Sequence, residues 1–134
     1  MTTREDIESY LIRMDAQFDE VDEGMWRLEA EDAAPVVVHF SPPVVLLRMK
    51  VLDLPTGGGE GALASLYRKL LELNATDIVH GSYGIEGGEV ILSDTLQLED
   101  LDFSELRSSY ESLAFAASQH MGQLSGLVPA AQEG

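Results

Sequence analysis

Two alternating apolar runs on either side of Gly87-Gly88 constrain the fold more than any other feature of the chain. Residues 79–85 and 90–98 alternate with the period of two that is typical of β-strands. Because glycine readily adopts the positive φ angles of tight turns, this spacing predicts a β-hairpin. With the two glycines at the turn, four residue pairs face each other: Ile85 with Val90, Tyr83 with Leu92, Gly81 with Asp94 and Val79 with Leu96. Three of these pairs bring apolar side chains together on one face.

The turn of this hairpin has two alternative forms. A two-residue turn at Gly87-Gly88 places Glu86 opposite Glu89, an arrangement that like charges disfavour. A four-residue loop of Glu86 to Glu89 avoids that contact. Both forms keep the same pairing of the two strands, so the sequence predicts the hairpin and leaves its turn open.

Helices are predicted before and after the hairpin and at the start of the chain. Before the hairpin, Asn74 stands where a left-handed C-cap would end a helix. After it, Asp102 and Glu105 form the pattern of a capping box, and Thr3 and Asp6 predict an N-cap for the first helix. The three apolar stripes recur at helical spacing: Ile7, Tyr10, Leu11, Met14 and Phe18; Leu63, Leu66, Tyr67, Leu70 and Leu71; and Leu106, Tyr110, Leu113, Ala114, Ala117, Met121 and Leu124.

Three further strands are predicted between the first helix and a glycine-rich loop. They cover residues 26–30, 36–40 and 44–52, where the apolar period is two. An acidic run precedes the first strand, and two turn regions, residues 31–35 and Ser41-Pro42-Pro43, separate the three. Alternate positions of the second and third strands give each an apolar face: Val36, Val38 and Phe40, and Val45, Leu47, Met49 and Val51.

The length of 134 residues predicts one domain, with residues 1–124 folded and residues 125–134 forming a frayed tail. The absence of cysteine excludes a disulfide framework, thiolate metal sites and thiol catalysis. No apolar run is long enough to span a bilayer, and the first residues lack the basic and apolar regions of a signal peptide. We therefore expect a cytoplasmic protein of bacterial type.

Acidic residues outnumber basic residues by 24 to 8, which gives a formal net charge of −16. A field of this sign repels nucleic acid and anionic membrane surfaces, so neither is expected as a partner. The same charge keeps a protein in solution when it exposes apolar surface for a partner protein. Simple solubility is the commoner reason for such a charge.

No residue pattern predicts a metal or cofactor site. The glycine-rich segment 56–65 lacks the lysine and following hydroxyl residue of a phosphate loop, and Glu60 would repel phosphate. The carboxylates of residues 99–105 lack the spacing of a calcium loop. They are explained more simply by the preference of acidic residues for the N-terminus of a helix. We expect neither a metal nor a cofactor.

The alternative function is a small enzyme or ligand-binding domain that uses His80 and nearby carboxylates. Asp94 lies close to His80 in the predicted hairpin, and Glu89 is a further carboxylate of the same strand. Ser82 and Ser93 complete a set that resembles a catalytic triad. The two serines pair with each other on the face opposite Asp94, however, so the groups do not converge. We therefore predict a chain that is not an enzyme.

The order helix, three strands, helix, hairpin, helix resembles the YbjN-type family, and three short motifs share the resemblance. These motifs are Leu70-Leu71-Glu72-Leu73-Asn74-Ala75, Gly81-Ser82-Tyr83-Gly84-Ile85 and Leu96-Gln97-Leu98-Glu99-Asp100-Leu101. Members of that family have a type III secretion chaperone-like fold, similar to the Tir-chaperone (CesT) group. The resemblance covers about residues 3 to 124, and its first half matches in architecture more than in residue identity.

This resemblance implies an α+β domain in which helices back a twisted antiparallel sheet of about five strands, in the order α-β-β-β-α-β-β-α. It also implies a homodimer to which the second helix and the hairpin contribute. The candidates for that interface are Leu66, Tyr67, Leu70 and Tyr83. An apolar sheet surface would hold an extended segment of a partner protein. The candidates for that surface are Val36, Val38, Phe40, Val45 and Leu47.

We therefore predict a homodimeric protein-binding module, chaperone-like or regulatory, that holds a segment of a client or regulatory protein. Strands with apolar residues on both faces give a second reason for this prediction. Any sheet face that the helices leave uncovered is a surface for a partner or a second copy. A dedicated partner subunit of one client is a further hypothesis of the same kind.

Overall fold

The computed structural model of the chain describes residues 1–30 and 33–128. Over these residues the chain forms three helices and six strands. The helices are α1 (Arg4–Arg13), α2 (Gly59–Thr76) and α3 (Phe103–Ser125). The strands are β1 (Gln17–Asp22), β2 (Met25–Ala30), β3 (Ala33–Ser41), β4 (Val44–Asp53), β5 (Ser82–Glu86) and β6 (Glu89–Gln97).

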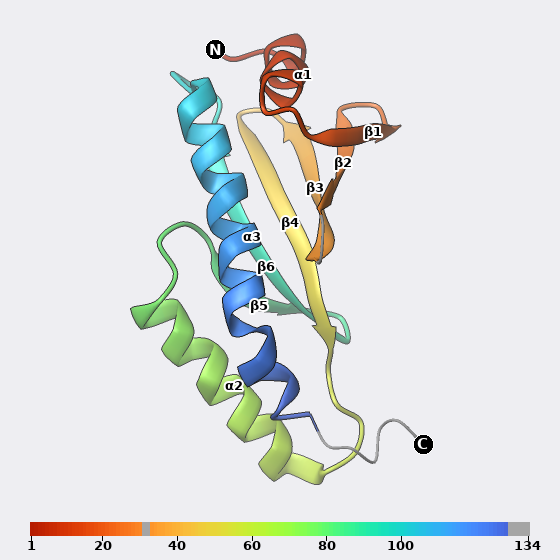
Figure 1. Ribbon diagram of the computed structural model, residues 1–134, viewed down its shortest axis with the longest axis vertical. Coiled ribbons are helices and arrows are strands. Elements are labelled where there is room, and N and C mark those ends of the chain that lie inside the picture. The colour runs from red at the N-terminus through yellow and green to blue at the C-terminus, as the bar shows by residue number, and fades with distance from the viewer. Residues whose placement is uncertain (31–32, 129–134) are drawn as a thin grey trace.

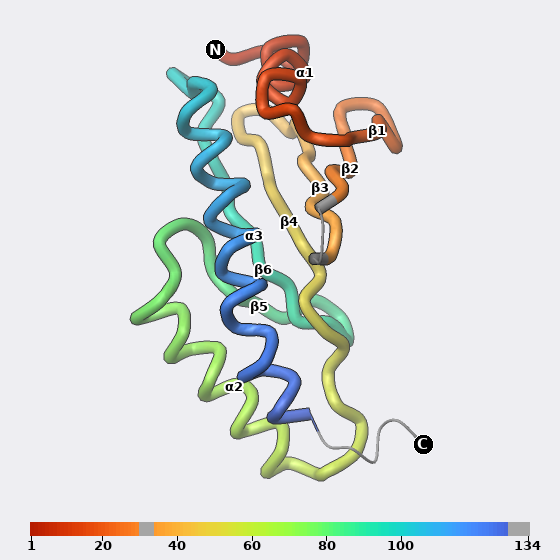
Figure 2. Tube along the Cα trace, viewed as in Figure 1, coloured from red at the N-terminus to blue at the C-terminus, as the bar shows by residue number. Residues whose placement is uncertain are grey.

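The strands form one antiparallel sheet in the order β1-β2-β3-β4-β6-β5. The first four strands are neighbours both in the chain and in the sheet, and the last hairpin adds β6 beside β4 and leaves β5 at the edge. In Figure 1, α1 lies at one end of the molecule and α2 at the other, with α3 along the sheet between them. Figure 2 traces the long link from β4 into α2. The predicted α+β class with an antiparallel sheet and backing helices is confirmed.

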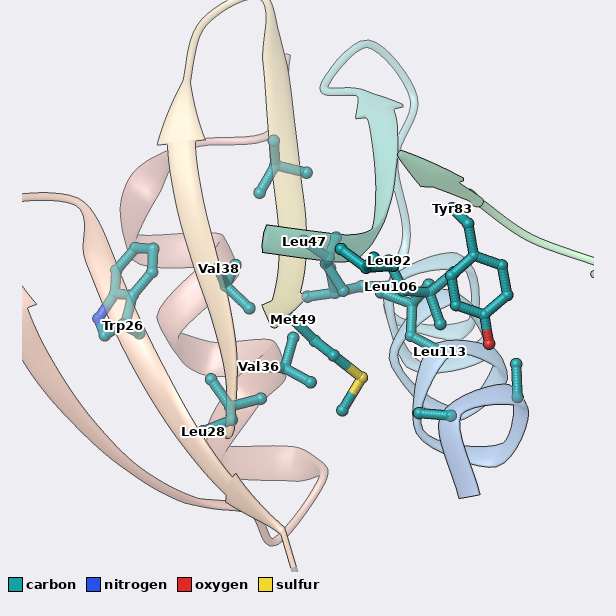
Figure 3. Close-up of a cluster of buried hydrophobic side chains, with 14 of the residues drawn as sticks. Trp26, Leu28, Val36, Val38, Leu47, Met49, Tyr83, Leu92, Leu106 and Leu113 are labelled. Atoms are coloured by element: carbon teal, nitrogen blue, oxygen red, sulfur yellow. The ribbon is translucent and has the colours of Figure 1, made fainter. Parts of the chain in front are cut away.

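One face of the sheet and all three helices share a single apolar core. Alternate side chains of β2, β3 and β4 are fully buried in it, as period-two patterning requires. Figure 3 shows side chains of the sheet, among them Leu47 and Leu92, gathered with Leu106 and Leu113 of α3. The side chains on the opposite face are half-buried or exposed. We call the two sides the inner face and the outer face.

The hairpin confirms the predicted register and takes the two-residue form of the turn. The two inner pairs are formed as predicted: Ile85 with Val90 and Tyr83 with Leu92. Glu86 lies opposite Glu89 beside the turn. The two outer pairs are not part of the ladder, because β5 begins only at Ser82. At Gly81 the backbone passes so close to β6 that a Cβ atom would lie 2.4 Å from the Ser93 carbonyl oxygen. Gly81 also has a φ of +85°, which residues with a side chain rarely adopt.

The sheet has one strand more than predicted, because the acidic run before Gly24 forms the edge strand β1. Phe18 is the single half-buried residue of β1, and the other five residues are exposed. A strand with one inward apolar side chain shows no period-two pattern, which explains why the sequence did not reveal it. Its pairing with β2 gives the sheet an acidic edge opposite the β5 edge.

Helix α2 continues beyond the predicted C-cap at Asn74. The helix ends at Thr76 and its C-cap is Asp77, with a right-handed φ of −114°. Asn74 instead faces β5, where its side-chain oxygen accepts from the Tyr83 N–H at 2.7 Å and its amide donates to the Tyr83 carbonyl at 3.2 Å. Because one side chain satisfies both backbone groups of Tyr83, Asn74 closes part of the open sheet edge.

Both predicted N-caps are confirmed. The Thr3 hydroxyl accepts from the Asp6 N–H, and the Asp6 carboxylate accepts from the Thr3 N–H at 2.9 Å, which completes a capping box. The Asp102 carboxylate accepts from the Glu105 N–H at 2.8 Å at the start of α3. Among the described residues, no helix has the length and apolar character needed to cross a membrane.

The two predicted turn regions have different outcomes. The Ser41-Pro42-Pro43 turn joins β3 to β4, with a cis peptide bond between the prolines. Of the turn predicted at residues 31–35, Glu31 and Asp32 lie outside the described residues, and the remaining positions belong to β3. Residues 129–134 of the predicted tail also lie outside the described residues, so the frayed tail stays a prediction.

Candidate functional site

The residues predicted to hold a partner segment lie on the inner face of the sheet. Four of them are fully buried in the core, and Phe40 is partly buried against it. These four are Val36, Val38, Val45 and Leu47. Figure 3 shows Val36, Val38 and Leu47 among the core side chains. In the isolated chain they join the sheet to the helices, so their role toward a partner stays a prediction.

The outer face carries a groove of about 670 Å³. Its lining includes Val37 and His39, which alternate along β3 with the buried inner residues Val36 and Val38. We call this hollow the outer groove. Its other lining residues include Met25 of β2, Arg48 and Lys50 of β4, Ile91 of β6, and Glu86 and Glu89 at the hairpin turn.

The charges of the outer groove are arranged as ion pairs. Arg48 pairs with Glu86 across the intervening strand β6, and Lys50 Nζ lies 2.9 Å from an Asp53 oxygen and 3.2 Å from a Glu89 oxygen. Hydrogen bonds to Asp53 first and to Glu89 second raise the pKa of Lys50. All these side chains are partly exposed, so solvent screens each pair and its contribution to stability is weak.

A second hollow of about 300 Å³ lies between α2 and the edge strand β5. Two exposed apolar side chains stand on it, Leu71 of α2 with 68% of its surface exposed and Ile85 of β5 with 46%. We call this hollow the edge groove. Its described lining residues are all uncharged: Tyr67, Leu70, Leu71, Asn74, Tyr83, Gly84 and Ile85.

Three of the four predicted interface residues line the edge groove. Tyr67 is half-buried, whereas Leu70 and Tyr83 are only 4% and 6% exposed. Leu66 does not line the groove and is fully buried in the core. The predicted interface is not tested by the isolated chain, but the sequence did identify three of the seven residues that line this hollow. Ile85 was missed as a surface residue because alternation alone does not distinguish a core position from an apolar edge position.

A partly buried polar chain joins the C-terminal end of α2 to β5 and α3. The Tyr83 hydroxyl lies 2.8 Å from His120 Nδ1, and His120 Nε2 lies 3.3 Å from an Asp77 oxygen. A neutral imidazole that accepts from Tyr83 and donates to Asp77 satisfies all three groups. Burial raises the pKa of Tyr83 to about 12. Sequence analysis did not predict this cluster, because His120 is adjacent in sequence to the predicted apolar stripe and does not belong to it.

The groups of the alternative enzyme site do not come together. The side chain of His80 is exposed, and its backbone N–H bonds to the Ser112 hydroxyl. The Asp94 carboxylate accepts from the Ser109 hydroxyl at 2.7 Å, and Glu89 pairs with Lys50 in the outer groove. In the described part of the chain, no three His, Cys, Asp or Glu side chains are grouped so that they could hold a metal ion. Nothing in this arrangement favours the alternative function.

Comparison with protein families gives one result over nearly the whole chain. A family model described as CesT_Tir_1 matches residues 1–129. Among curated proteins, none matches the chain at a significant level.

Comparison with solved structures shows that the fold is shared. A chain of the heterodimeric ExoU–SpcU complex, from the type III secretion system of Pseudomonas aeruginosa, has a TM-score of 0.66 at 15% identity, covering 91% of this chain and 97% of that one. YbjN of E. coli, a putative transcription regulator, has a TM-score of 0.70 at 11% identity, covering 90% and 93%. The Yersinia pestis type III secretion chaperone SycH, solved with a fragment of YscM2, has a TM-score of 0.57 at 16% identity, covering 84% and 93%. The resemblance to YbjN and to secretion chaperones is confirmed at the level of fold.

Proposed function

Because the chain belongs to the CesT_Tir_1 family, we propose that it is a homodimeric protein-binding module that holds a segment of a partner protein. The module is not an enzyme, acts in the cytoplasm, and serves either as a chaperone of its partner or as a regulator through protein contact. Fold neighbours that were solved in complexes with other proteins support a protein partner. The family and the fold are those of chaperone-type binding proteins.

The outer face of the sheet, which none of the described helices covers, is the observation that carries this proposal. Helices and inner-face side chains form one core, whereas Val37, Leu46 and Ile91 on the outer face are only half-buried. A hollow of about 670 Å³ over this face is large enough for several side chains of a bound segment. An apolar, grooved surface without a covering element is typical of a site for another protein.

The edge groove supports a homodimer. Two copies that each carry a formal charge of −16 repel each other, so a stable contact between them requires surface without charge. The lining of the edge groove is uncharged and exposes Leu71 and Ile85, which a second copy would cover. Tyr67, Leu70 and Tyr83 form the wall against which those side chains would pack, and Leu66 supports the wall from the core.

The five inner-face residues would contact a partner only if a helix moved away from the sheet. Val36, Val38, Val45 and Leu47 are closed off by the core, whereas the outer face of the same strands is open. We therefore propose that the partner binds the outer face. The close packing of the inner face against the helices keeps the sheet rigid.

Two measurements test this function. Light scattering after size exclusion tests the homodimer, and a monomer at tens of micromolar would contradict it. Affinity capture from the native cell tests the partner. Recovery of one stoichiometric protein favours a dedicated chaperone-like role, whereas partners in substoichiometric amounts favour regulation. Loss of capture when Val37→Glu is introduced, with the dimer retained, would place the partner on the outer face.

A further inference from the structure

The outer groove has a definite polarity across the sheet. Apolar side chains of β2 and β3, Met25 and Val37, line one side, and carboxylates of the hairpin turn line the other. The aliphatic stems of Arg48 and Lys50 cross between the two sides, because β4 lies between β3 and β6. The groove therefore presents an apolar floor and an acidic rim.

The acidic rim follows from the strand register. Asp53 of β4 pairs with Glu89 of β6, which in turn pairs with Glu86 of β5, so three carboxylates form one row across three strands. Like charges in directly opposed positions disfavour one another. Two cations, Arg48 and Lys50, are paired with these three acids, which leaves the row with one negative charge in excess.

In two of the three pairs the acid is the more accessible member, and in the Lys50–Glu89 pair the two side chains are almost equally exposed, at 49% and 46%. The Glu86 side chain is 64% exposed against 37% for Arg48, and the Asp53 side chain is 74% exposed against 49% for Lys50. Each pair engages one oxygen of its carboxylate, and a carboxylate accepts several hydrogen bonds at once. A new cation can therefore reach the rim while the existing pairs remain.

We propose that the outer groove binds an extended segment that alternates apolar and cationic side chains. Apolar side chains contact Met25, Val37 and Ile91, and a lysine or arginine of the segment contacts Glu86 and Glu89. The field of a chain with a formal charge of −16 attracts such a segment and repels an acidic one. This inference rests on the proposed function and gives the chemistry of its partner.

Three synthetic peptides with identical apolar residues and with Lys, Ser or Glu at the alternate positions test the proposal. Titration calorimetry with the full chain is expected to show the Lys peptide binding at least about tenfold more tightly than the Glu peptide at low salt. The affinity for the Lys peptide is expected to fall as salt rises, because the contacts are exposed ion pairs. Equal affinities for the Lys and Glu peptides would overturn the proposal, as would the absence of binding by all three.

Paired variants separate the rim from the overall charge. The double variant Glu86→Gln, Glu89→Gln is expected to lower the affinity for the Lys peptide about fivefold and to leave the affinity for the Ser peptide unchanged. Glu60→Gln with Glu99→Gln removes the same charge from exposed positions outside the groove and is the matched control. If the control weakens the Lys peptide as much as the rim variant does, the segment does not contact the rim.

A substitution of Val37 tests the apolar floor of the outer groove. Val37→Ser is expected to weaken all three peptides, whereas Thr95→Ser, on the outer face but outside the groove, is expected to weaken none. Thermal unfolding of each variant confirms that it is folded. Failure of these peptide tests with a dimer that still captures a cellular protein would overturn the partner chemistry and leave the proposed function in place.

Discussion

The edge groove and the outer groove are both lined by apolar side chains, but they differ in charge. Seven uncharged residues line the edge groove, and exposed Leu71 and Ile85 stand on it. The outer groove is more than twice as large and carries Arg48 and Lys50 with their carboxylate partners. In a chain with a formal charge of −16, surface free of acids is scarce.

This difference in charge supports our proposal that the chain binds both a second copy of itself and another protein. A second copy brings the same negative charge, so it can approach closely only where the surface is uncharged. A different partner can bring cations, so it gains from the charges that a second copy must avoid. The two grooves therefore suit two kinds of partner.

The largest effect is expected from charges placed in the edge groove. Leu71→Asp and Ile85→Asp each bury an unpaired carboxylate in the proposed dimer contact, and we expect the dimer dissociation constant to rise at least about 30-fold, or about 2 kcal/mol. Analytical ultracentrifugation measures the change. Val79→Asp, at an 82% exposed apolar position outside the groove, is the matched control and should leave the dimer intact. An unchanged dimer in both groove variants would remove the edge groove from the interface.

The next effect is expected at Asn74, which bonds to both backbone groups of Tyr83. Asn74→Ala leaves a donor and an acceptor of β5 without these partners, and we expect it to lower the free energy of unfolding by about 1–3 kcal/mol. Asn74→Asp retains an acceptor for the Tyr83 N–H and should lose less. Urea denaturation compares the three proteins. If alanine and aspartate behave alike, the two hydrogen bonds do not hold α2 to the sheet edge.

A smaller effect is expected from Tyr83→Phe, which removes the hydroxyl bonded to His120. Loss of this bond should cost about 1 kcal/mol at neutral pH. Burial raises the pKa of Tyr83 to about 12 from 10.0, so folding favours the neutral phenol. The stability that the neutral Tyr83 phenol contributes is fully present below pH 10.0, and it is lost as the pH rises through about 12. Urea denaturation from neutral to alkaline pH should therefore show the difference between wild type and variant shrinking as the pH rises. A constant difference would contradict the buried position of the hydroxyl.

The smallest effect is expected from salt, and its sign differs between the two grooves. Raising the salt from about 50 mM to about 500 mM screens repulsion between two acidic copies, so the dimer should tighten severalfold. The same change should weaken the Lys peptide in the outer groove, because it screens attraction. Sedimentation and calorimetry measure the two effects. Salt effects of the same sign would show that the grooves do not differ in this way.

Much of the fold could be predicted, because the period of the apolar residues determines both the elements and their faces. The hairpin pairs at Tyr83 and Ile85, the N-caps at Thr3 and Asp102, and the face shared by Val36 and Val38 were all found as predicted. Each depends on residues near in sequence or on simple alternation.

The features that were missed depend on contacts between distant segments. β1 is a strand because β2 pairs with it, although Phe18 is its single half-buried residue. Asn74 looks like a helix cap in the sequence, yet it bonds to a strand nine residues later. His120 is buried because Tyr83 and Asp77 come to it from other elements. Local sequence rules do not contain such pairings.

The partner site shows the same limit. Alternation correctly grouped Val36 and Val45 on one face of their strands, but it could not say which face the helices would cover. The helices cover that face, and the face with Val37 and Arg48 is left open. Helix placement depends on the whole chain, so the outer groove became visible only in the structure.

We propose that two copies of this chain join and leave the outer groove free for a partner. Light scattering after size exclusion, at about 30 µM chain and moderate salt, tests it most directly, first alone and then with the Lys peptide in excess. We expect twice the chain mass of 14.6 kDa in both conditions, with bound peptide adding to the dimer in the second. A mass of 14.6 kDa for the chain alone, or a dimer that the peptide splits into monomers, would contradict the claim.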